Sequence, residues 1–277
     1  MTRLPSPFTT FIRSVALLAI ATLGISLTAR AADDLDRRVQ QATWVLQDLQ
    51  KIPEQAIPPN LLNSAYAVAV LPSVLKGGFI VGGSYGKGVL LVRQSDGAWS
   101  NPSFIKLANL GIGFQAGAQG ADLVLVFKTR RGIDNIARGK FTLGGSASAS
   151  AGPVGRTALA MTDGEFKAEI YTYARSRGLF AGVALDGGAI TIDQVANASW
   201  YAGARDTTAN TIFTDRSLAA PAAGQELVAT LGSMAPQVNW KDSALASQPP
   251  AAAPPAETGS KTYAIEDGAQ PAPETRF

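Results

Sequence analysis

The chain has 277 residues, with 24 lysines and arginines against 21 acidic residues and neither cysteine nor histidine. Without these two residue types there is no disulfide, no cysteine metal site, no Ser-His-Asp or Cys-His catalytic arrangement, and no imidazole ligand for a transition metal. We therefore expect a non-enzymatic protein with no metal and no cofactor, held together by a packed core.

The first 31 residues have the order of a secretory signal peptide. Arg3 and Arg13 precede an apolar run over residues 15–27, and this run ends before Ala29-Arg30-Ala31. A basic region, an apolar region and an A-x-A site are typical of export with cleavage. We predict cleavage near Ala31, which would release a periplasmic or secreted chain. A second form of this prediction places the released chain at the periphery of a membrane. An uncleaved N-terminal anchor is the alternative.

Removal of this segment changes the charge balance. Residues 1–31 hold three arginines and no acid, which leaves 21 basic and 21 acidic side chains. A neutral chain offers no general attraction to nucleic acid, so we expect no nucleic-acid partner. Attraction to anionic lipid would have to come from a local patch.

Residues 33–52 are predicted to form an amphipathic helix ended by Pro53. Its apolar positions recur every three or four residues, at Leu35, Val39, Ala42, Leu46, Leu49 and Ile52. One interpretation packs this stripe on the domain. The other lays it on a membrane surface, although the polar face is less basic than that of most interfacial helices.

The next part of the chain is predicted to be rich in strands. Residues 67–71 form an apolar run before Pro72, and two further runs, 79–81 and 89–92, flank the glycine-rich residues 82–88, which suggests a turn or bulge. The nearly all-apolar residues 122–127 predict a central strand buried on both faces.

The second half continues the pattern and then loses it. Residues 141–151 and 165–175 alternate as strands do, and 179–185 with 189–192 predict a hairpin around Asp186-Gly187-Gly188. A helix is expected over 223–231, followed by an Ala/Pro-rich disordered tail.

These elements predict an α+β fold. The core would be a strand-dominated, antiparallel, two-layer or barrel-like structure with an N-terminal amphipathic helix and a disordered C-terminal tail. The expected domains are a signal peptide (1–31), one lipid-binding domain (32–235, core about 60–205) and the tail (236–277).

Two glycine-rich segments resemble nucleotide-binding motifs, but their glycines do not have the spacing that these motifs require. In residues 82–88 the glycines are one residue too close for a phosphate loop and Lys87 is followed by glycine, while Gly111 to Gly117 is one residue too long for a dinucleotide fingerprint. Scattered acids such as Asp96, Asp122 and Asp193 form no evident acid/base pair. A carboxylate- or metal-dependent hydrolase therefore stays only as the second alternative.

Basic and aromatic residues beside the glycine-rich segments are the candidate site. Backbone N–H groups and cations there could hold an anionic head group, and the candidate head-group residues are Lys76, Lys87, Arg93, Arg175 and Arg177. Aromatic and aliphatic side chains suit a membrane interface or an apolar groove. The candidates for this role are Leu35, Val39, Leu46, Leu49, Tyr85, Trp99, Trp200 and Tyr201.

Long collinear segments resemble the SYLF domain, a family also labelled the yeast actin-binding domain. They are Leu71-Pro72, Lys76 to Phe79, Gly82 to Gly88, Trp99 to Pro102, Asp122 to Val124, Ala151 to Arg156, Tyr171 to Gly182 and Trp200 to Gly203. The match covers about residues 53–231. In the closing segment Ala202 is inserted relative to the usual pattern, which predicts a shift of the last strand or loop.

The resemblance implies a lipid-binding module without catalytic residues. Family members in eukaryotes are associated with phosphoinositides, and some bind actin. An exported bacterial protein would meet neither, so actin is not expected as a partner and the implied ligand is an anionic phospholipid or a fatty molecule at a membrane surface. The alternative is a structural or protein-interaction module of the envelope with an envelope protein as its partner and no lipid ligand.

Overall fold

The computed structural model describes residues 32–51, 56–78, 81–112, 119–138, 141–143, 147–155, 165–176, 179–182, 188–201 and 207–236, together with positions 158 and 161. All of them belong to one compact unit, Met1–Ser247. The predicted signal peptide and the tail after residue 236 lie outside the described residues, so these two predictions stay untested.

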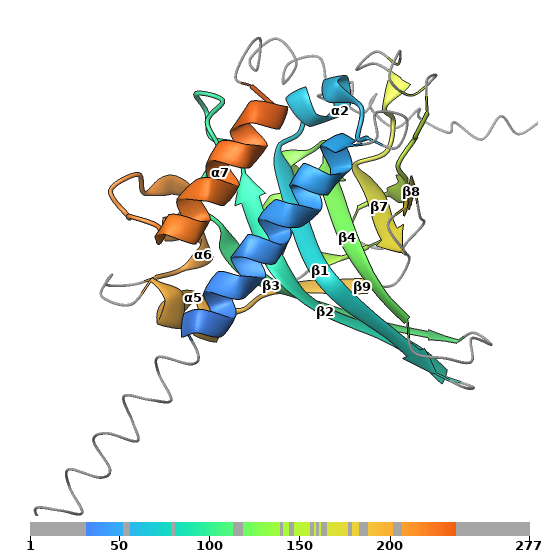
Figure 1. Cartoon of the computed structure of the whole chain (residues 1–277), viewed down its shortest axis with the longest axis horizontal. Helices are drawn as coiled ribbons and strands as arrows, with labels where there is room; N and C mark the ends of the chain where they lie inside the picture. The colour runs from blue at the N-terminus through green and yellow to red at the C-terminus, as the bar shows by residue number, and fades with distance from the viewer. Residues whose placement is uncertain are drawn as a thin grey trace, which may run out of the picture. The chain divides into compact units, whose positions relative to one another are not determined.

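Within the described residues, nine strands form a single sheet, with β5-β9-β3-β2-β1-β4-β7-β6 as neighbours and β8 beside β7. All pairs are antiparallel except β6 with β7. The sheet curls into a half-barrel (Figure 1), which confirms the expected α+β, strand-dominated antiparallel fold. The strands are β1 (Ala67–Gly78), β2 (Val81–Val92), β3 (Ser103–Ile112), β4 (Gln119–Phe127), β5 (Phe141–Thr142), β6 (Ala149–Ala151), β7 (Ile170–Ser176), β8 (Leu179–Gly182) and β9 (Gly188–Ile192).

The helices lie around this sheet. An N-terminal helix spans residues 32–51 and lies beside α7 across one face of the sheet (Figure 1). Both run toward α2, so their C-terminal ends approach that short helix. The others are α2 (Pro59–Asn63), α3 (Arg130–Ala137), α5 (Gln194–Trp200), α6 (Ala209–Thr214) and α7 (Ala222–Met234).

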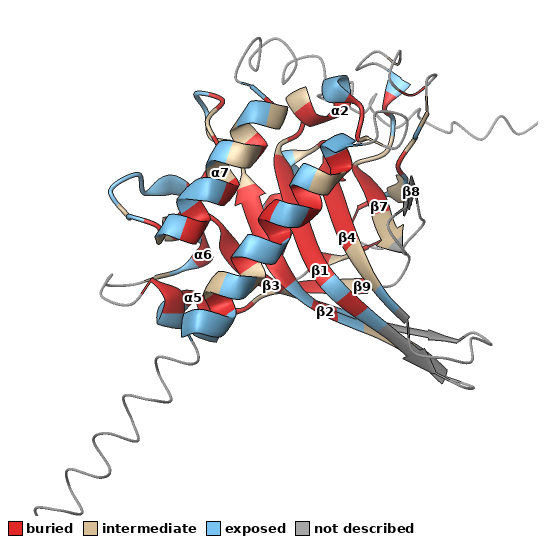
Figure 2. Ribbon diagram, viewed as in Figure 1, coloured by how far each residue is buried: buried red, intermediate tan, exposed pale blue. Residues whose placement is uncertain are grey.

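The apolar stripe of the N-terminal helix faces the sheet. Leu35, Val39, Leu46 and Leu49 are all buried, and buried segments alternate with exposed ones along this helix in Figure 2. Polar contacts align the same face, because Trp200 donates Nε1–H to Asp36 at 2.7 Å and the Arg38 guanidinium lies over the Phe104 ring. Of the two interpretations of this helix, packing on the domain is the one that the structure has.

We call the sheet face beneath this helix the helix-side face. Phe104 of β3 belongs to it through the Arg38 contact. Because side chains alternate along a strand and paired residues share a face, the register also assigns Val89, Val70, Val124 and Tyr173 to it. All of these are buried. The β4 residues 123–127 are buried on both faces, which confirms the predicted central strand.

Two expectations about strands β1 and β2 were wrong. Pro72 does not end the first strand: β1 continues to Gly78 through a β-bulge between Leu71 and Val74. Of the turn or bulge expected at the glycine-rich residues 82–88, the turn is wrong, because these residues lie inside β2, whereas the register of β1 against β2 does shift between Tyr85 and Val89. Glycine is required there because β1 packs very closely against β2, and a Cβ on Gly88 would lie 2.1 Å from the Val70 carbonyl oxygen.

The predicted hairpin of residues 179–192 was also wrong. Strand β8 pairs with β7, whereas β9 pairs with β3 and β5, on the other side of the sheet. The local sequence shows a turn between two strands but cannot show that the strands then diverge to different partners. The segment around Trp200 is the helix α5, whose N-cap Asp193 accepts a hydrogen bond from the Ala196 N–H.

Candidate functional site

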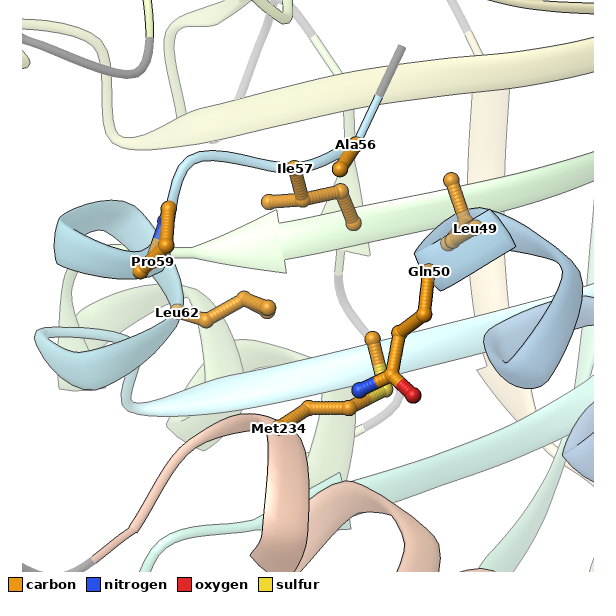
Figure 3. A pocket seen from close by; sticks show the side chains of 7 residues that line it. All are labelled: Leu49, Gln50, Ala56, Ile57, Pro59, Leu62 and Met234. Carbon is orange, nitrogen blue, oxygen red and sulfur yellow. The ribbon is translucent and has the colours of Figure 1, made fainter. Parts of the chain in front are cut away.

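An apolar cleft of about 330 Å³ opens where the N-terminal helix, α2 and α7 converge. Leu49 and Gln50 come from the end of the N-terminal helix, Met234 from the end of α7, and the rest from α2 and the residues before it (Figure 3). The other lining residues are Ala56, Ile57, Pro59 and Leu62. Gln50 is the single polar side chain among them, so the cleft suits an uncharged hydrocarbon group.

Arg93 joins two walls of this cleft from the interior. Its guanidinium donates to the carbonyl oxygens of Leu62 in α2 (3.2 Å) and Ala235 just after α7 (3.3 Å). It also donates to Gly97, Ala65 and Pro236 and lies 4.3 Å from the centre of the Trp99 ring. A cation at the carbonyl end of α7 is favourable for the helix dipole.

Arg93 therefore lies inside the protein, not at a surface where a head group could reach it. The side chain is 4% exposed. Burial lowers the pKa of Arg93 to about 10, so the guanidinium stays charged at neutral pH. This corrects the prediction that Arg93 binds a head group: its hydrogen bonds go to backbone carbonyls that would otherwise be buried without donors.

The third wall, the end of the N-terminal helix, is held to the sheet by charge. Asp48 forms ion pairs with Arg175 of β7 at 2.5 Å and with Lys51 at 2.6 Å. Arg175 also lies 3.6 Å from Asp122 of β4. Arg175, a predicted head-group residue, is thus committed to two carboxylates, and it positions the helix end that carries Leu49 and Gln50.

The ion pairs of Asp48 predict an acid-sensitive helix end. Its hydrogen bond with Lys51, helped by the nearby Arg175, holds the pKa of the Asp48 carboxyl below its ordinary value of 3.8. The pairs therefore contribute stability above pH 3.8, and this is lost as the pH falls through the lower folded pKa. We expect Asp48→Asn to cost about 0.5–1 kcal/mol of unfolding free energy at pH 7.

Urea unfolding over a pH series would measure this effect. The stabilities of the wild type and of Asp48→Asn should converge at acidic pH. Asp134→Asn is the matched control, because Asp134 reaches Arg130 only at 4.0 Å on an exposed surface. A difference between wild type and Asp48→Asn that stays constant at all pH values would contradict the assignment.

The remaining predicted cations are not gathered around the cleft. Lys87 is exposed on β2, and its alternation with Val89 places it on the helix-side face. Lys76 lies in β1, but its side chain is outside the described part, as is Arg177 altogether. Among the described side chains, Lys87, Arg93 and Arg175 thus have three different environments, and no common head-group site unites them.

The predicted aromatic residues also separate. Trp99, Trp200 and Tyr201 are buried, and the Tyr201 hydroxyl donates to the Pro102 carbonyl at 2.7 Å. Burial raises the pKa of Tyr201. Only Tyr85 among these four aromatic residues is exposed. Leu49 reaches the cleft, whereas Leu35, Val39 and Leu46 pack in the core.

Sequence reasoning missed most of the cleft. Ala56, Ile57, Pro59, Leu62 and Met234 come from segments far apart in the chain, and no motif marks them. Two signals were available in the sequence. One was the apolar Ile57 beside two prolines, and the other was the helix end predicted near residue 232. Neither shows that the two segments meet.

Two features are absent from the part of the chain that the structure describes. No group of three or more acidic side chains in those ranges is placed to hold a metal ion. No helix there combines the length and the apolar character needed to cross a membrane.

The curled sheet, its helical cover and the apolar cleft together define a β-rich binding domain. Residues 108–234 match the family described as "Ysc84: Las17-binding protein actin regulator". Relatives named YSC84-like align over a longer part of the chain. The chain therefore belongs to the Ysc84 family, that of the SYLF domain, which is described as a family of binding proteins and regulators.

Three relatives illustrate the likeness. The SH3 domain-containing protein PJ696.02 of Schizosaccharomyces pombe is 35% identical over 68% of this chain and 44% of its own length. The SH3 domain-containing YSC84-like protein 1 of Rattus norvegicus is 36% identical over 61% and 51%. The LAS seventeen-binding protein 3 of Saccharomyces cerevisiae is 38% identical over 61% and 37%. The chain thus spans about half the length of these relatives, or less.

Proposed function

We propose that this chain is a non-enzymatic lipid-binding protein of the bacterial envelope whose cleft takes the hydrocarbon part of a fatty molecule or an anionic phospholipid. The observation that carries the proposal is the cleft of about 330 Å³ with six apolar lining residues and one amide. This volume is about ten times the ~30 Å³ that one water molecule occupies in the liquid, so the cleft is large enough for part of a hydrocarbon chain.

The supports of the cleft walls favour binding over chemistry. The ionisable side chains that support the cleft walls, Arg93 and Arg175, hold α2, α7 and the N-terminal helix in place. Pre-formed apolar pockets of this kind bind ligands without large rearrangement. The chain also has no histidine or cysteine to act as base or nucleophile.

In this proposal the local basic patch, which was expected to select the head group, has a smaller role than expected. Burial of hydrocarbon supplies the affinity, at about 0.8 kcal/mol for each methylene group removed from water. Gln50 is left to contact a polar group at the cleft. The signal-like residues 1–31 support a periplasmic or secreted location, at the periphery of a membrane.

Filling the cleft tests the proposal. Ala56 is half-buried in the lining, so Ala56→Trp would occupy space that a ligand needs. We expect the affinity for a dansyl-labelled long-chain fatty acid to fall at least about tenfold, because several methylene groups lose their place. Fluorescence titration of the chain from Ala32 onward measures this, and competition with phosphatidylglycerol ranks the natural ligand classes.

The matched control is Ala198→Trp, which adds the same side chain at an exposed position of α5. It should bind the probe like the wild type. Equal probe affinity in all three proteins would place binding outside the cleft, and no binding by the wild type would remove the lipid proposal.

A protein-interaction role is the second candidate. It is favoured by the family description, which refers to Las17 binding and actin regulation, and by the relative named as a LAS seventeen-binding protein. For this chain the partner would be an envelope protein. The test is cross-linking in cells with the whole chain and with a chain that ends at Ala246. The shortened chain should lose a specific partner but still bind the fatty-acid probe.

A further inference from the structure

The cleft has an apolar floor and a single amide at its mouth. Leu49, Ile57 and Leu62 are buried, whereas Gln50 is exposed. In Figure 3 the Gln50 side chain extends toward Met234, so its amide lies between the end of the N-terminal helix and the end of α7. A lipid whose hydrocarbon chain enters the cleft would therefore leave its head group beside Gln50.

The cations at the end of the N-terminal helix are balanced by carboxylates. Lys51 lies 2.6 Å from Asp48, and Arg175 lies 2.5 Å from Asp48 and 3.6 Å from Asp122. Two cations thus face two carboxylates, and this corner of the mouth carries no net charge. A head group beside Gln50 would have to displace one of these ion pairs to gain a cation of its own.

The charge of Arg93 is balanced in a different way. Its guanidinium is buried and donates hydrogen bonds to the carbonyl oxygens of Leu62 and Ala235, at the ends of α2 and α7. The carbonyl end of a helix carries partial negative charge. Arg93 therefore compensates the helix ends behind the cleft and does not offer its charge at the mouth.

The other two walls add no positive charge. Residues 56–64 contain no charged side chain, and α7 contains only Glu226, an exposed acid eight residues before Met234. At a rise of about 1.5 Å per residue, its backbone lies about 12 Å from that of Met234. Among the described side chains of the three walls, no unpaired cation reaches the mouth.

A neutral mouth discriminates between head groups. A carboxylate or a phosphate beside Gln50 would lose part of its hydration with no cation to compensate for the loss. A hydroxyl or ester group loses much less. The glutamine amide can donate a hydrogen bond to such a group and can accept one from a hydroxyl.

We propose that the cleft selects neutral single-chain lipids with a hydroxyl and ester head group, of the monoacylglycerol type, over fatty-acid carboxylates and anionic phospholipids. Gln50 is the residue that determines this specificity. A single chain is specified because the volume of about 330 Å³ holds part of one hydrocarbon chain. The inference rests on the proposed function and narrows its ligand to one chemical class.

Calorimetric titration of the chain from Ala32 onward tests this choice with decanoate and monodecanoylglycerol, each below its aggregation concentration in 0.1 M salt. We expect the wild type to bind the neutral ligand at least about tenfold more tightly. Gln50→Lys places a cation at the mouth and should raise the affinity for decanoate about fivefold or more, with little change for the neutral ligand. Gln50→Glu should lower the affinity for decanoate further.

The change in the affinity ratio between variants is the decisive quantity, because the difference in water solubility of the two ligands is the same for every variant. Gln40→Lys is the matched control, since it adds the same charge at an exposed position of the same helix, about 15 Å before Gln50. At that distance most of its effect is screened, so the ratio should stay that of the wild type. Lys51→Gln should leave the affinity for decanoate unchanged, because Lys51 is paired with Asp48.

Four results would overturn the inference. Decanoate that binds the wild type as tightly as the neutral ligand would do so and would leave the proposed function standing. Equal changes of the ratio in Gln50→Lys and Gln40→Lys would remove Gln50 from the site. Weaker decanoate binding by Lys51→Gln would assign the head group to that lysine. Binding of neither ligand would remove the proposed function together with this inference.

Discussion

Replacing Arg93 by methionine is expected to lower the free energy of unfolding by about 3–5 kcal/mol. Methionine keeps much of the apolar stem but donates no hydrogen bond. The carbonyl oxygens of Leu62, Ala65, Gly97, Ala235 and Pro236 would each lose a donor in a buried or half-buried place. The contact with the Trp99 ring would be lost as well.

The same change should loosen the cleft. Since Arg93 bridges α2 and the end of α7, its loss frees Leu62 and Met234 to move apart, and the affinity for the fatty-acid probe should fall together with stability. Urea unfolding followed by tryptophan fluorescence measures stability, and probe titration well below the midpoint measures binding.

Two controls separate this role from a general effect of losing an arginine. Arg216→Met removes an exposed cation that pairs with Asp96, and it should change stability by less than about 1 kcal/mol. Arg93→Lys keeps the charge but reaches fewer carbonyls, so its stability should be intermediate. If Arg93→Met and Arg216→Met unfold at the same urea concentration, the bridging role is wrong.

The parts of the fold that the sequence predicts are those decided by local pattern. The N-terminal helix follows from the spacing of Leu35, Val39, Leu46 and Leu49, and the buried strand β4 follows from the unbroken apolar run over residues 123–127. In both segments the pattern of apolar residues persists over enough positions to distinguish a helix from a strand. The α+β fold with a strand-dominated, antiparallel core follows from such segments.

The parts that escaped prediction depend on distant residues. Pro72 has the local properties of a strand end, but pairing of β1 with β2 and β4 on both sides carries the strand through a bulge. Arg93 beside a turn looks like a surface cation, and its burial is decided by the ends of α2 and α7. Leu75, which is 62% exposed, looks like a core residue until the bulge in β1 reverses its direction.

The site shows the same division. Leu49 was singled out by its helical spacing and does line the cleft, whereas Met234 meets it only through the packing of α7 beside the N-terminal helix. Tyr85 and Lys87 were singled out by type, but they lie outside the cleft. Composition could therefore suggest binding chemistry, while its location needed tertiary structure.

Replacing Gly88 by alanine is expected to destabilise the domain by about 3 kcal/mol or more. The new Cβ would lie 2.1 Å from the Val70 carbonyl oxygen and 2.7 Å from the Leu71 Cα. These are backbone atoms of β1, so no side-chain rotation can relieve the clash. The two central strands would have to separate just where the bulge begins, next to fully buried Val89 and Leu71.

Gly120→Ala is the matched control, because this glycine also lies in a strand, and its added Cβ would meet nothing within 4 Å. Its stability should stay within about 0.5 kcal/mol of the wild type. Urea unfolding of the two variants side by side makes the comparison. If both lose stability equally, intrinsic strand propensity explains the effect. If only Gly88→Ala does, close contact between strands accounts for the glycine at this position of β2, where a phosphate-binding loop is the familiar alternative.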